Sequence, residues 1–222
     1  MKAMLLAAGR GERLRPITDS LPKPLVPVAG RPLIAWHLTA LSRAGIREIV
    51  INLSWLAERL RAALGDGSEW GVSITWSEEG PVPLETGGGI FRAVPLLGPG
   101  PFLVVNADIW TDIDFAALAL EEGALAHLVL VPNPPHNARG DFGLDGDLVV
   151  SRDSDRFTYS GVGLLRPELF HGCSGERFPL LPVLNRAIAA RGVRGELHRG
   201  AWSDVGTAER LAQLEARLAA LK

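Results

Sequence analysis

The chain has 222 residues, of which 47% are hydrophobic and 22% charged, and a formal net charge of −2. Such a chain is long enough to bury a substantial core, as one large domain or two small ones. The near-neutral charge gives no reason to expect nucleic acid or an acidic membrane as a partner. Cys173 is the only cysteine, which excludes an intrachain disulfide.

The sequence carries no membrane or export signal. No segment has the run of about 18 apolar residues that a membrane-spanning helix needs. At the N-terminus only six apolar residues separate Lys2 from Gly9, which is too short a run for a signal peptide. We therefore expect a cytoplasmic protein.

The first hundred residues predict strands that alternate with helices. Short apolar runs predict buried strands over 4–8, 48–53, 72–76 and 102–105. Helical spacing of apolar residues predicts helices over 32–45, 55–64 and from 86 onward. This order predicts an α/β fold with a doubly wound, mainly parallel (Rossmann-like) sheet and helices on both of its faces.

The second half of the chain is less regular. Strands are predicted over 126–131 and 158–165, a proline-rich loop over 132–140, a helical turn over 167–170, and helices over 180–190 and 208–221. No repeat, low-complexity tract or linker divides the chain. We therefore expect a single domain over 1–222.

Polar segments follow three of the predicted strands. Residues 9–13, 79–88 and 106–108 each begin where an apolar strand ends. Because ligands of parallel sheets bind at the carboxyl ends of the strands, we expect these segments to form one active site.

The first of these segments is rich in glycine and basic residues. Gly9 and Gly11 allow a sharp turn whose backbone N–H groups bind anions, and Arg13 and Lys23 follow. The Walker Gly-Lys-Ser/Thr pattern is absent, and Leu14 stands where a dinucleotide fingerprint needs its third glycine. On spacing alone, a tight turn with solvated arginines is the better explanation, since short glycine motifs recur by chance.

A longer stretch of sequence favours the anion-binding loop over the simple turn. Leu6-Ala7-Ala8-Gly9-x-Gly11-x-Arg13-Leu14-x-Pro16-x-Thr18, followed by Pro22-Lys23-Pro24-Leu25, resembles the signature of the sugar-phosphate nucleotidyltransferases. The resemblance continues through 84–89, 105–108 and 202–207 and so covers nearly the whole chain. It implies an enzyme that joins a nucleoside triphosphate to a sugar 1-phosphate and releases pyrophosphate. The family commonly has Thr where this chain has Glu12.

The resemblance also implies roles for residues of the first half. Arg13 and Lys23 are expected to be catalytic. The expected nucleotide-binding residues are Leu6, Ala7, Ala8, Gly9, Gly11, Glu12, Arg13, Lys23, Glu79, Thr86, Gly87 and Gly88. Residues 86–89 are expected to form a glycine loop against which the base lies, with a flexible surface loop as the alternative. The family commonly has Gly where this chain has Glu85.

Two aspartates are the candidate ligands of the Mg²⁺ cofactor that the resemblance implies. Asp108 follows the strand over 102–105, where a carboxylate can bind Mg²⁺ together with substrate phosphates, although Asn106 and Asp108 also suit an ordinary turn. The resemblance assigns Asp204 to the same ion, and helix capping near Thr207 is the alternative. Because Asp108 and Asp204 are 96 positions apart, the sequence alone does not show that they meet.

Other polar and aromatic residues have simpler explanations. The five histidines show no metal-ligand spacing. His37 is expected to pack within a helix, and the other four are expected at the surface or in the sugar pocket: His127, His136, His171 and His198. Most tryptophans are expected in the core, whereas Trp110 stands close enough to Asp108 to be a binding candidate.

By the same resemblance the late part of the chain contacts the sugar. The expected substrate-binding residues are Asn106, Arg139, Gly140, Asp141 and Ser160. Longer family members carry a Glu-Lys-Pro run before the late strand, whereas this chain has residues 153–156 there without a lysine. The phosphate contact of that lysine is therefore missing or comes from elsewhere. We expect a nucleotide-binding half over about 1–110 and sugar-binding elaborations over about 111–222.

Within the family, the compact length and the run Gly-Pro-x-Pro-Leu-Glu-Thr-Gly-Gly-Gly over 80–89 are most similar to the uridylyltransferases that act on N-acetylmuramic acid 1-phosphate in peptidoglycan recycling. This similarity implies UTP and that sugar phosphate as substrates, and a monomer or small homo-oligomer. A mannose or heptose 1-phosphate guanylyltransferase is the nearest alternative. A non-catalytic nucleotide-binding regulatory module is a different one.

Overall fold

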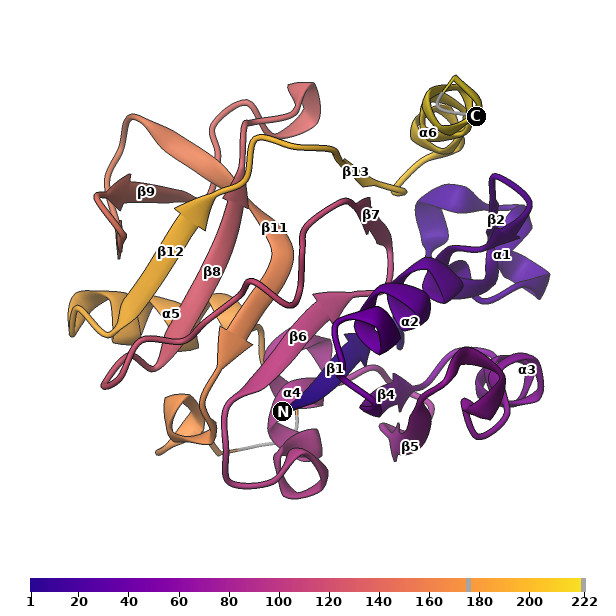
Figure 1. The fold of residues 1–222 in the computed structure, drawn as a ribbon, viewed down its shortest axis with the longest axis horizontal. Coiled ribbons are helices and arrows are strands. Elements are labelled where there is room, and N and C mark those ends of the chain that lie inside the picture. The colour runs from indigo at the N-terminus through magenta and orange to yellow at the C-terminus, as the bar shows by residue number, and fades with distance from the viewer. Residues whose placement is uncertain (175–176, 221–222) are drawn as a thin grey trace.

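A computed structural model describes residues 1–174 and 177–220, and its centre is one nine-stranded mixed sheet. The strands follow the order β5-β4-β1-β6-β11-β8-β12-β10-β9 (Figure 1). Their bounds are β1 Lys2–Leu6, β4 Glu48–Leu53, β5 Ser73–Glu78, β6 Phe102–Asn106, β8 Ala126–Val131, β9 Phe142–Asp145, β10 Leu148–Val150, β11 Arg156–Leu165 and β12 Val193–Leu197.

The first four strands of this order form a parallel sheet with helices on both faces, which confirms the predicted fold class. Leu5 of β1 pairs with Ile51 of β4 on one side and with Val105 of β6 on the other. Helix α2 (Leu33–Arg43) covers one face of β1, and α4 (Glu85–Leu97) lies behind it (Figure 1). Helix α3 (Ala57–Leu64) joins the side of α2, and α5 (Leu180–Ala189) the side of α4.

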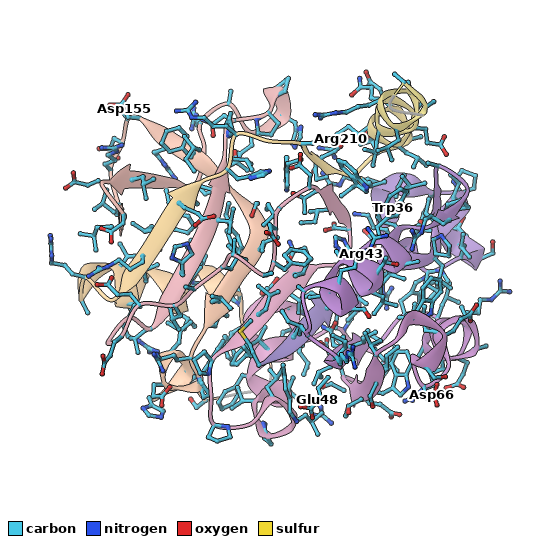
Figure 2. All side chains as sticks on the ribbon, viewed as in Figure 1. Trp36, Arg43, Glu48, Asp66, Asp155 and Arg210 are labelled. Carbon is cyan, nitrogen blue, oxygen red and sulfur yellow. The ribbon has the colours of Figure 1, made fainter. Side chains whose placement is uncertain are left out.

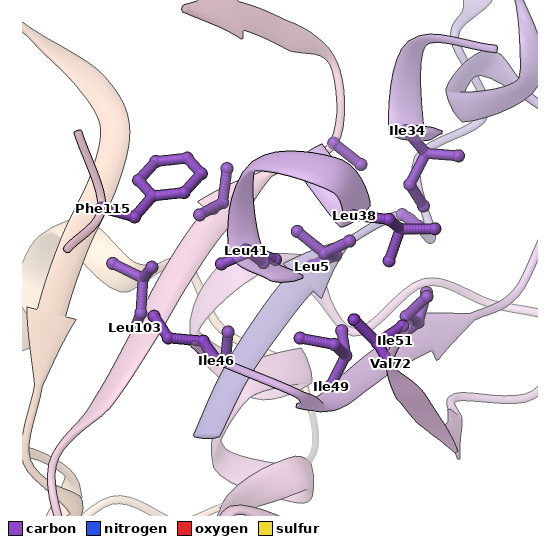
Figure 3. Packing of buried hydrophobic residues seen from close by; sticks show 14 of the residues in the cluster. Leu5, Ile34, Leu38, Leu41, Ile46, Ile49, Ile51, Val72, Leu103 and Phe115 are labelled. Carbon is purple, nitrogen blue, oxygen red and sulfur yellow. The ribbon is translucent and has the colours of Figure 1, made fainter. Parts of the chain in front are cut away.

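Successive side chains of each strand point to opposite faces of the sheet, and each face has its own apolar core. Leu5, Ile49 and Leu103 point to the core under α2 (Figure 3), whereas Met4 and Phe102 point to the core under α4. All five side chains are buried. Since full burial of such a side chain contributes about 1.5–3 kcal/mol, both faces hold the helices firmly.

The remaining strands make the sheet mixed. β11 pairs antiparallel with β6 and β8, β12 pairs parallel with β8, and β10 and β9 complete the edge through antiparallel pairs. The sequence patterns did not predict β9, β10 or β12. The pairing of β11 with β8 shifts register between Tyr159 and Val162, where Gly161 has a φ of +84° that favours glycine.

A third apolar cluster lies beside the parallel half. Two small sheets pair β2 (Pro27–Val28) with β3 (Arg31–Pro32) and β7 (Ile109–Thr111) with β13 (Trp202–Asp204). Leu214 and Leu218 of α6 (Ala208–Ala219) pack there with Trp110, whose ring meets Trp36 edge-on at 6.1 Å. Trp110 is therefore a core residue, and α6 is docked next to β13 (Figure 1).

Short helical segments complete the chain: α1 Ile17–Ser20, η1 Glu12–Leu14, η2 Lys23–Leu25, η3 Ser68–Trp70, η4 Pro135–Asn137 and η5 Pro167–Phe170. The last residue of the helix predicted over 208–221, Leu221, lies outside the described residues. Among the helices of the described ranges, none combines the length and the apolar character that crossing a membrane requires.

Candidate active site

A cavity of about 650 Å³ opens at the carboxyl ends of β1, β4, β5 and β6. Its walls are Leu6, Ala7, Ala8, Gly9, Arg10, Gly11, Glu12, Arg13, Lys23, Pro24, Asn52, Glu79, Pro83, Glu85, Thr86, Asn106, Asp108 and Gly206. The three polar segments that the sequence placed at strand ends thus share one cavity. Gly206 is the wall residue that comes from the second half of the chain.

The loop after β1 forms the floor of this cavity. The strand ends at Leu6, two residues before the predicted end, so Ala7 and Ala8 belong to the loop. Gly11 has a φ of +65°, and its carbonyl oxygen accepts a hydrogen bond from Thr18 Oγ1 at 2.8 Å. A Cβ on Gly11 would lie 2.9 Å from Thr18 Cγ2, so both the backbone conformation and the packing require glycine.

A buried hydrogen-bond chain joins the walls of the cavity. The Ala7 N–H donates to Asn52 Oδ1 at 2.6 Å, and Asn52 Nδ2 donates to Glu79 Oε1 at 2.6 Å. The Leu84 N–H donates to Glu79 Oε2 at 2.7 Å. Asn52 and Glu79 are both buried, so this chain fixes β1, β4, β5 and the entry to α4 relative to one another. The sequence analysis missed Asn52, although an asparagine within an apolar strand is a signal for it.

The glycine run after Thr86 is helical, which corrects the predicted loop. Gly87 and Gly88 lie in α4 and are absent from the cavity walls. A Cβ on Gly87 would lie 2.8 Å from the Phe178 carbonyl oxygen, to which the Gly88 N–H donates at 3.0 Å. A Cβ on Gly89 would approach Glu79 Oε1 and lie 3.1 Å from Asn52 Nδ2. The glycines therefore let α4 approach its neighbours closely.

The start of α4 faces the cavity. Glu85 and Thr86 line it, and Glu85 has a φ of +62°, a conformation that costs a non-glycine residue about 1–2 kcal/mol. The chain thus keeps a glycine-like backbone at the position where the family commonly has Gly. The Glu85 side chain forms an ion pair with Arg177, with Oε1 of Glu85 3.1 Å from Nε of Arg177.

The structure brings Asp108 and Asp204 to neighbouring positions. Asp108 follows β6 directly, and β7 pairs antiparallel with β13 so that Ile109 lies opposite Asp204. The Val205 N–H donates to the Asp108 carbonyl oxygen at 2.8 Å. A short strand pair therefore closes the 96-residue separation that the sequence left open.

Each of the two carboxylates is paired with cationic groups. Lys23 Nζ, which is buried, lies 2.6 Å from Asp108 Oδ2. Arg210 Nη1 lies 2.8 Å from Asp204 Oδ2, and His136 Nε2 lies 3.3 Å from Asp204 Oδ1. Figure 2 labels Arg210 where α6 faces β13. The sequence indicated no role for Arg210, whereas His136 was one of the histidines expected at the surface or in the sugar pocket.

The donor set fits a magnesium ion that shares its ligands with substrate. Across residues 1–174 and 177–220, no three His, Cys, Asp or Glu side chains gather as a metal cage. Mg²⁺ takes one or two carboxylates and completes its shell with water and phosphate oxygens. Asp108 lines the cavity, and Asp204, which is not a wall residue, lies on the neighbouring strand β13, so the two aspartates supply that number of carboxylates.

His37 supports the segment that follows Asp108. Its Nε2 lies 2.7 Å from the Ile109 carbonyl oxygen and is its hydrogen-bond donor. Burial lowers the pKa of His37 to about 4, against smaller opposing effects of that hydrogen bond and of Asp108. The imidazole is therefore neutral and ties α2 to β7, in agreement with the predicted packing role.

The predicted sugar-side residues do not all reach the cavity. Asn106 lines it and packs on Gly161, whose Cβ would lie 2.7 Å from Asn106 Nδ2. Ser160 is buried next to the register shift of β11. Its hydroxyl accepts from the Val162 N–H, and its carbonyl oxygen accepts from Trp202 Nε1 at 2.8 Å. Ser160 thus holds β13 in place from outside the cavity walls.

Gly140 and Asp141 brace the loop that carries His136. Gly140 has a φ of +63°, and its Cβ would lie 2.8 Å from the Arg156 carbonyl carbon. Asp141 accepts from the Tyr159 N–H at 2.8 Å and from Asn137 Nδ2 at 3.2 Å. Both carboxylate oxygens of Asp141 are therefore engaged within the protein.

Arg139 is exposed and lies in a second cavity, of about 550 Å³. The other walls of this cavity are Asn133, Ala138, Asp153, Ser154, Asp155 and Arg156. Figure 2 labels Asp155 at the end of the molecule that carries β9 and β11, away from Arg210. Arg139 is thus not among the residues that the structure gathers around Asp108.

Comparisons with known proteins agree with this architecture. The sequence profile of the family described as nucleotidyl transferase matches residues 2–147. An N-acetylmuramate alpha-1-phosphate uridylyltransferase of Neisseria meningitidis is 52% identical over the full length of both chains. The enzyme of the same name from Caulobacter vibrioides is 35% identical, over 98% of this chain and 96% of its own.

A solved structure shows the same fold. It is named for a glucose-1-phosphate thymidylyltransferase from Bacillus anthracis and matches 98% of this chain and 94% of its own, with a TM-score of 0.88 at 20% identity. The profile match and the full-length relatives show that this chain belongs to the nucleotidyltransferase family.

Proposed function

We propose that this protein transfers a uridylyl group from UTP to N-acetylmuramic acid 1-phosphate, giving UDP-N-acetylmuramic acid and pyrophosphate, and that it serves peptidoglycan recycling in the cytoplasm. The observation that carries this proposal is the 52% identity with the Neisseria enzyme of that name, which extends over both full chains. The cavity supports it, because Asp108 and most of the expected nucleotide-binding residues line it.

The reaction needs no covalent intermediate with the protein. A phosphate oxygen of the sugar 1-phosphate attacks the α-phosphorus of UTP, a new P–O bond forms, and the bond to the bridging oxygen of the leaving pyrophosphate breaks. Positioning and charge stabilisation suffice for such an in-line transfer. The cavity offers both through a glycine loop and two cationic side chains, Arg13 and Lys23.

Arg13 and Lys23 have different settings, which suggests different roles. Arg13 is exposed at the cavity mouth, where it can bind the β- and γ-phosphates together with the loop N–H groups. Lys23 is buried and held 2.6 Å from Asp108, so its ammonium is fixed where charge develops at the α-phosphate.

Asp108 and Asp204 would hold the Mg²⁺ ion. When bound, the ion neutralises phosphate charge and aligns the two phosphates. Lys23 pairs with Asp108 and Arg210 pairs with Asp204, so each expected metal ligand also contacts a cationic side chain.

The uracil is expected against the wall formed by the loop after β1 and the start of α4. Ala7, Glu79 and Thr86 line that wall, and the buried chain through Asn52 keeps it rigid. Gly87 and Gly88 support this wall from behind, because Gly87 has no side chain to clash with Phe178 and the Gly88 N–H donates to the Phe178 carbonyl oxygen.

The whole chain is proposed to act as one domain, as a monomer or small homo-oligomer. Its nucleotide-binding half spans about 1–110 and its sugar-binding elaborations about 111–222. The continuous nine-stranded sheet across both halves supports this organisation.

Pyrophosphate release with a panel of substrates tests the proposal. Each nucleoside triphosphate is incubated with Mg²⁺ and with the 1-phosphates of N-acetylmuramic acid, N-acetylglucosamine, mannose and a heptose. The proposal requires the highest kcat/KM with UTP and the muramic acid compound. Preference for GTP with mannose or heptose 1-phosphate would instead show a guanylyltransferase, and nucleotide binding without turnover would show a regulatory module.

A further inference from the structure

Arg210 occupies an electrostatically unusual place. It lies in the first turn of α6, where its backbone N–H donates to the Thr207 hydroxyl at 3.3 Å. The N-terminus of a helix carries partial positive charge, so a cation there is unfavourable unless an anion lies nearby. The Arg210 side chain is 14% exposed, which makes the need for an anionic partner stronger.

Asp204 contacts only one nitrogen of the Arg210 guanidinium, so the N–H donors on its other nitrogens are not used by Asp204. Within the described residues, the hydrogen bonds of Arg210 to Asp204 run through Nη1, at 2.8 Å and 3.1 Å. Nε is buried and finds no acceptor in the same part of the chain. A guanidinium has five N–H donors, so Arg210 keeps donors for a second acceptor while it holds Asp204.

The remaining donors lie next to the cavity. Arg210 packs on Gly206, a cavity wall residue, whose Cβ would lie 2.8 Å from Arg210 Cζ. Arg13 reaches the same glycine, with Nη2 3.4 Å from the same Cβ position. Two guanidinium groups therefore converge on one wall. Their mutual repulsion is relieved when an anion binds between or beside them.

The basic side chains nearest the predicted sugar region have other partners. Arg156 Nη2 donates to the Asp141 carbonyl oxygen at 2.6 Å. Arg152 Nη2 donates to the carbonyl oxygens of Leu144 and Asp155, at 3.1 Å and 2.8 Å. Arg156 Nε, like Arg210 Nε, is buried without an acceptor in the described residues, but Arg156 lies in the wall of the second cavity, whereas Arg210 packs on a wall of the cavity that contains Asp108.

We propose that Arg210 binds the phosphate group of the sugar 1-phosphate, donating from its free N–H groups while Nη1 remains on Asp204. This assignment rests on the proposed function and supplies the phosphate contact for which the sequence offered no lysine. The planar guanidinium suits two oxyanions at once, the Asp204 carboxylate on one edge and a phosphate on another.

Equilibrium binding tests this role apart from turnover. Isothermal titration with N-acetylmuramic acid 1-phosphate and with unphosphorylated N-acetylmuramic acid, each with Mg²⁺ and a non-hydrolysable UTP analogue, measures what the phosphate contributes. Arg210→Ala should lose roughly 10–100-fold in affinity for the phosphorylated sugar and little for the other, because charge-assisted hydrogen bonds are removed. Arg210→Lys should lose less. Arg217→Ala, in an exposed part of the same helix, is the control.

A merely structural role gives a different pattern. If Arg210 only holds Asp204 in place, Arg210→Ala will change Mn²⁺ affinity and leave the preference for the phosphorylated sugar as in wild type, and the assignment is overturned. Wild-type protein that does not bind any sugar 1-phosphate overturns it as well. If wild type turns over another sugar 1-phosphate instead, the proposed substrate is wrong, and the same comparison with that sugar decides the role of Arg210.

Discussion

The two halves of the sheet are built differently and contribute different chemistry. In the parallel half, a loop follows the carboxyl end of each of β1, β5 and β6, and these loops supply Arg13, Glu79 and Asp108 directly. In the mixed half, β8, β11 and β12 carry no cavity residue. That half reaches the cavity through the return of the chain along β13, which places Asp204 opposite Ile109 and brings Gly206 into the cavity wall.

This difference shows how the site is divided. The parallel half holds a nearly complete phosphate pocket on its own framework, whereas the mixed half adds one carboxylate and Arg210 through a three-residue strand and one helix. We therefore expect changes in the first half to act on the triphosphate, on the metal through Asp108 and on stability, and changes in the second half to act on the metal through Asp204 and on the sugar.

The largest effect among side chains of the parallel half is expected at Lys23. Lys23→Ala should lower kcat by roughly 10²–10³-fold, since a fixed charge at the reacting phosphate is removed. Arg13→Ala should raise the KM for UTP and lower kcat/KM by roughly 10–100-fold, because its partner is present before reaction. Steady-state kinetics at varied UTP separates the two patterns.

Arg15→Ala is the matched control for these two variants, because Arg15 is exposed and pairs with Asp19. The reverse pattern would exchange the roles of Lys23 and Arg13. Unchanged kinetics in both variants would remove this loop from the phosphate site.

The rigidity of the parallel half is tested at Gly89. Glycine to alanine inside a helix normally stabilises by up to about 1 kcal/mol. Here the new methyl group meets Glu79 and Asn52, so Gly89→Ala should destabilise by about 1–3 kcal/mol and weaken UTP binding. Urea unfolding and UTP titration measure both. Gly100→Ala, where a Cβ has open space, should change neither, and a stabilised Gly89→Ala variant would contradict the buried hydrogen-bond chain.

The contact of α2 with β7 through His37 is tested by the pH dependence of stability. The folded protein takes up the His37 proton near a pKa of about 4, whereas the unfolded chain takes it up near 6.5. Lowering the pH therefore favours unfolding, and between pH 7 and 5 this group should cost about 2 kcal/mol of stability. His37→Gln, which keeps a donor near Nε2, should flatten the pH dependence of urea unfolding by that amount. The same change at exposed His171 should not, and equal slopes for the two variants would refute the buried neutral imidazole.

The smallest effect is expected at Arg139 in the mixed half. N-acetylmuramic acid carries a lactyl carboxylate that an arginine can bind through paired hydrogen bonds. If Arg139 does so, Arg139→Ala should lower kcat/KM a few-fold more for muramic acid 1-phosphate than for N-acetylglucosamine 1-phosphate. Its exposed position beside Asp153 and Asp155 limits the effect. Equal losses on both sugars would leave the lactyl contact unassigned.

The parallel and mixed halves of the sheet also differ in how well the sequence predicted them. Apolar runs with helices between them gave β4 and β8 with their observed bounds and placed β1, β5 and β6 within two residues. β1, β4, β6 and β8 are buried on both faces, so their composition alone marks them, whereas the edge strand β5 shows an alternation of buried and exposed residues. Polar residues at their ends therefore pointed to the cavity without any knowledge of the rest of the fold.

Apart from β8 and β11, the strands outside the parallel half gave no such signal. β7, β9, β10 and β13 have three or four residues each, and β12 contains Arg194, Gly195 and Glu196. Such strands have neither an apolar run nor a clear alternation, and their partners are distant in sequence. The meeting of Asp108 with Asp204 depends on β7 and β13 and became visible only in three dimensions. Residues 86–89 carried two predictions, a helix from the spacing of the apolar residues and a loop from the glycine run, and the structure has the helix because packing overrides the low helix propensity of glycine.

Divalent-metal binding tests most directly the central claim that the two halves share one ion. Mn²⁺ titration followed by electron paramagnetic resonance should show one site in wild type in the presence of a non-hydrolysable UTP analogue. Asp108→Asn and Asp204→Asn should each abolish that site and lower turnover by orders of magnitude while the protein stays folded, because each removes a charged ligand. Asp145→Asn, at the exposed end of β9, should bind as wild type does. Wild-type Mn²⁺ affinity in either the Asp108 or the Asp204 variant would contradict the shared site.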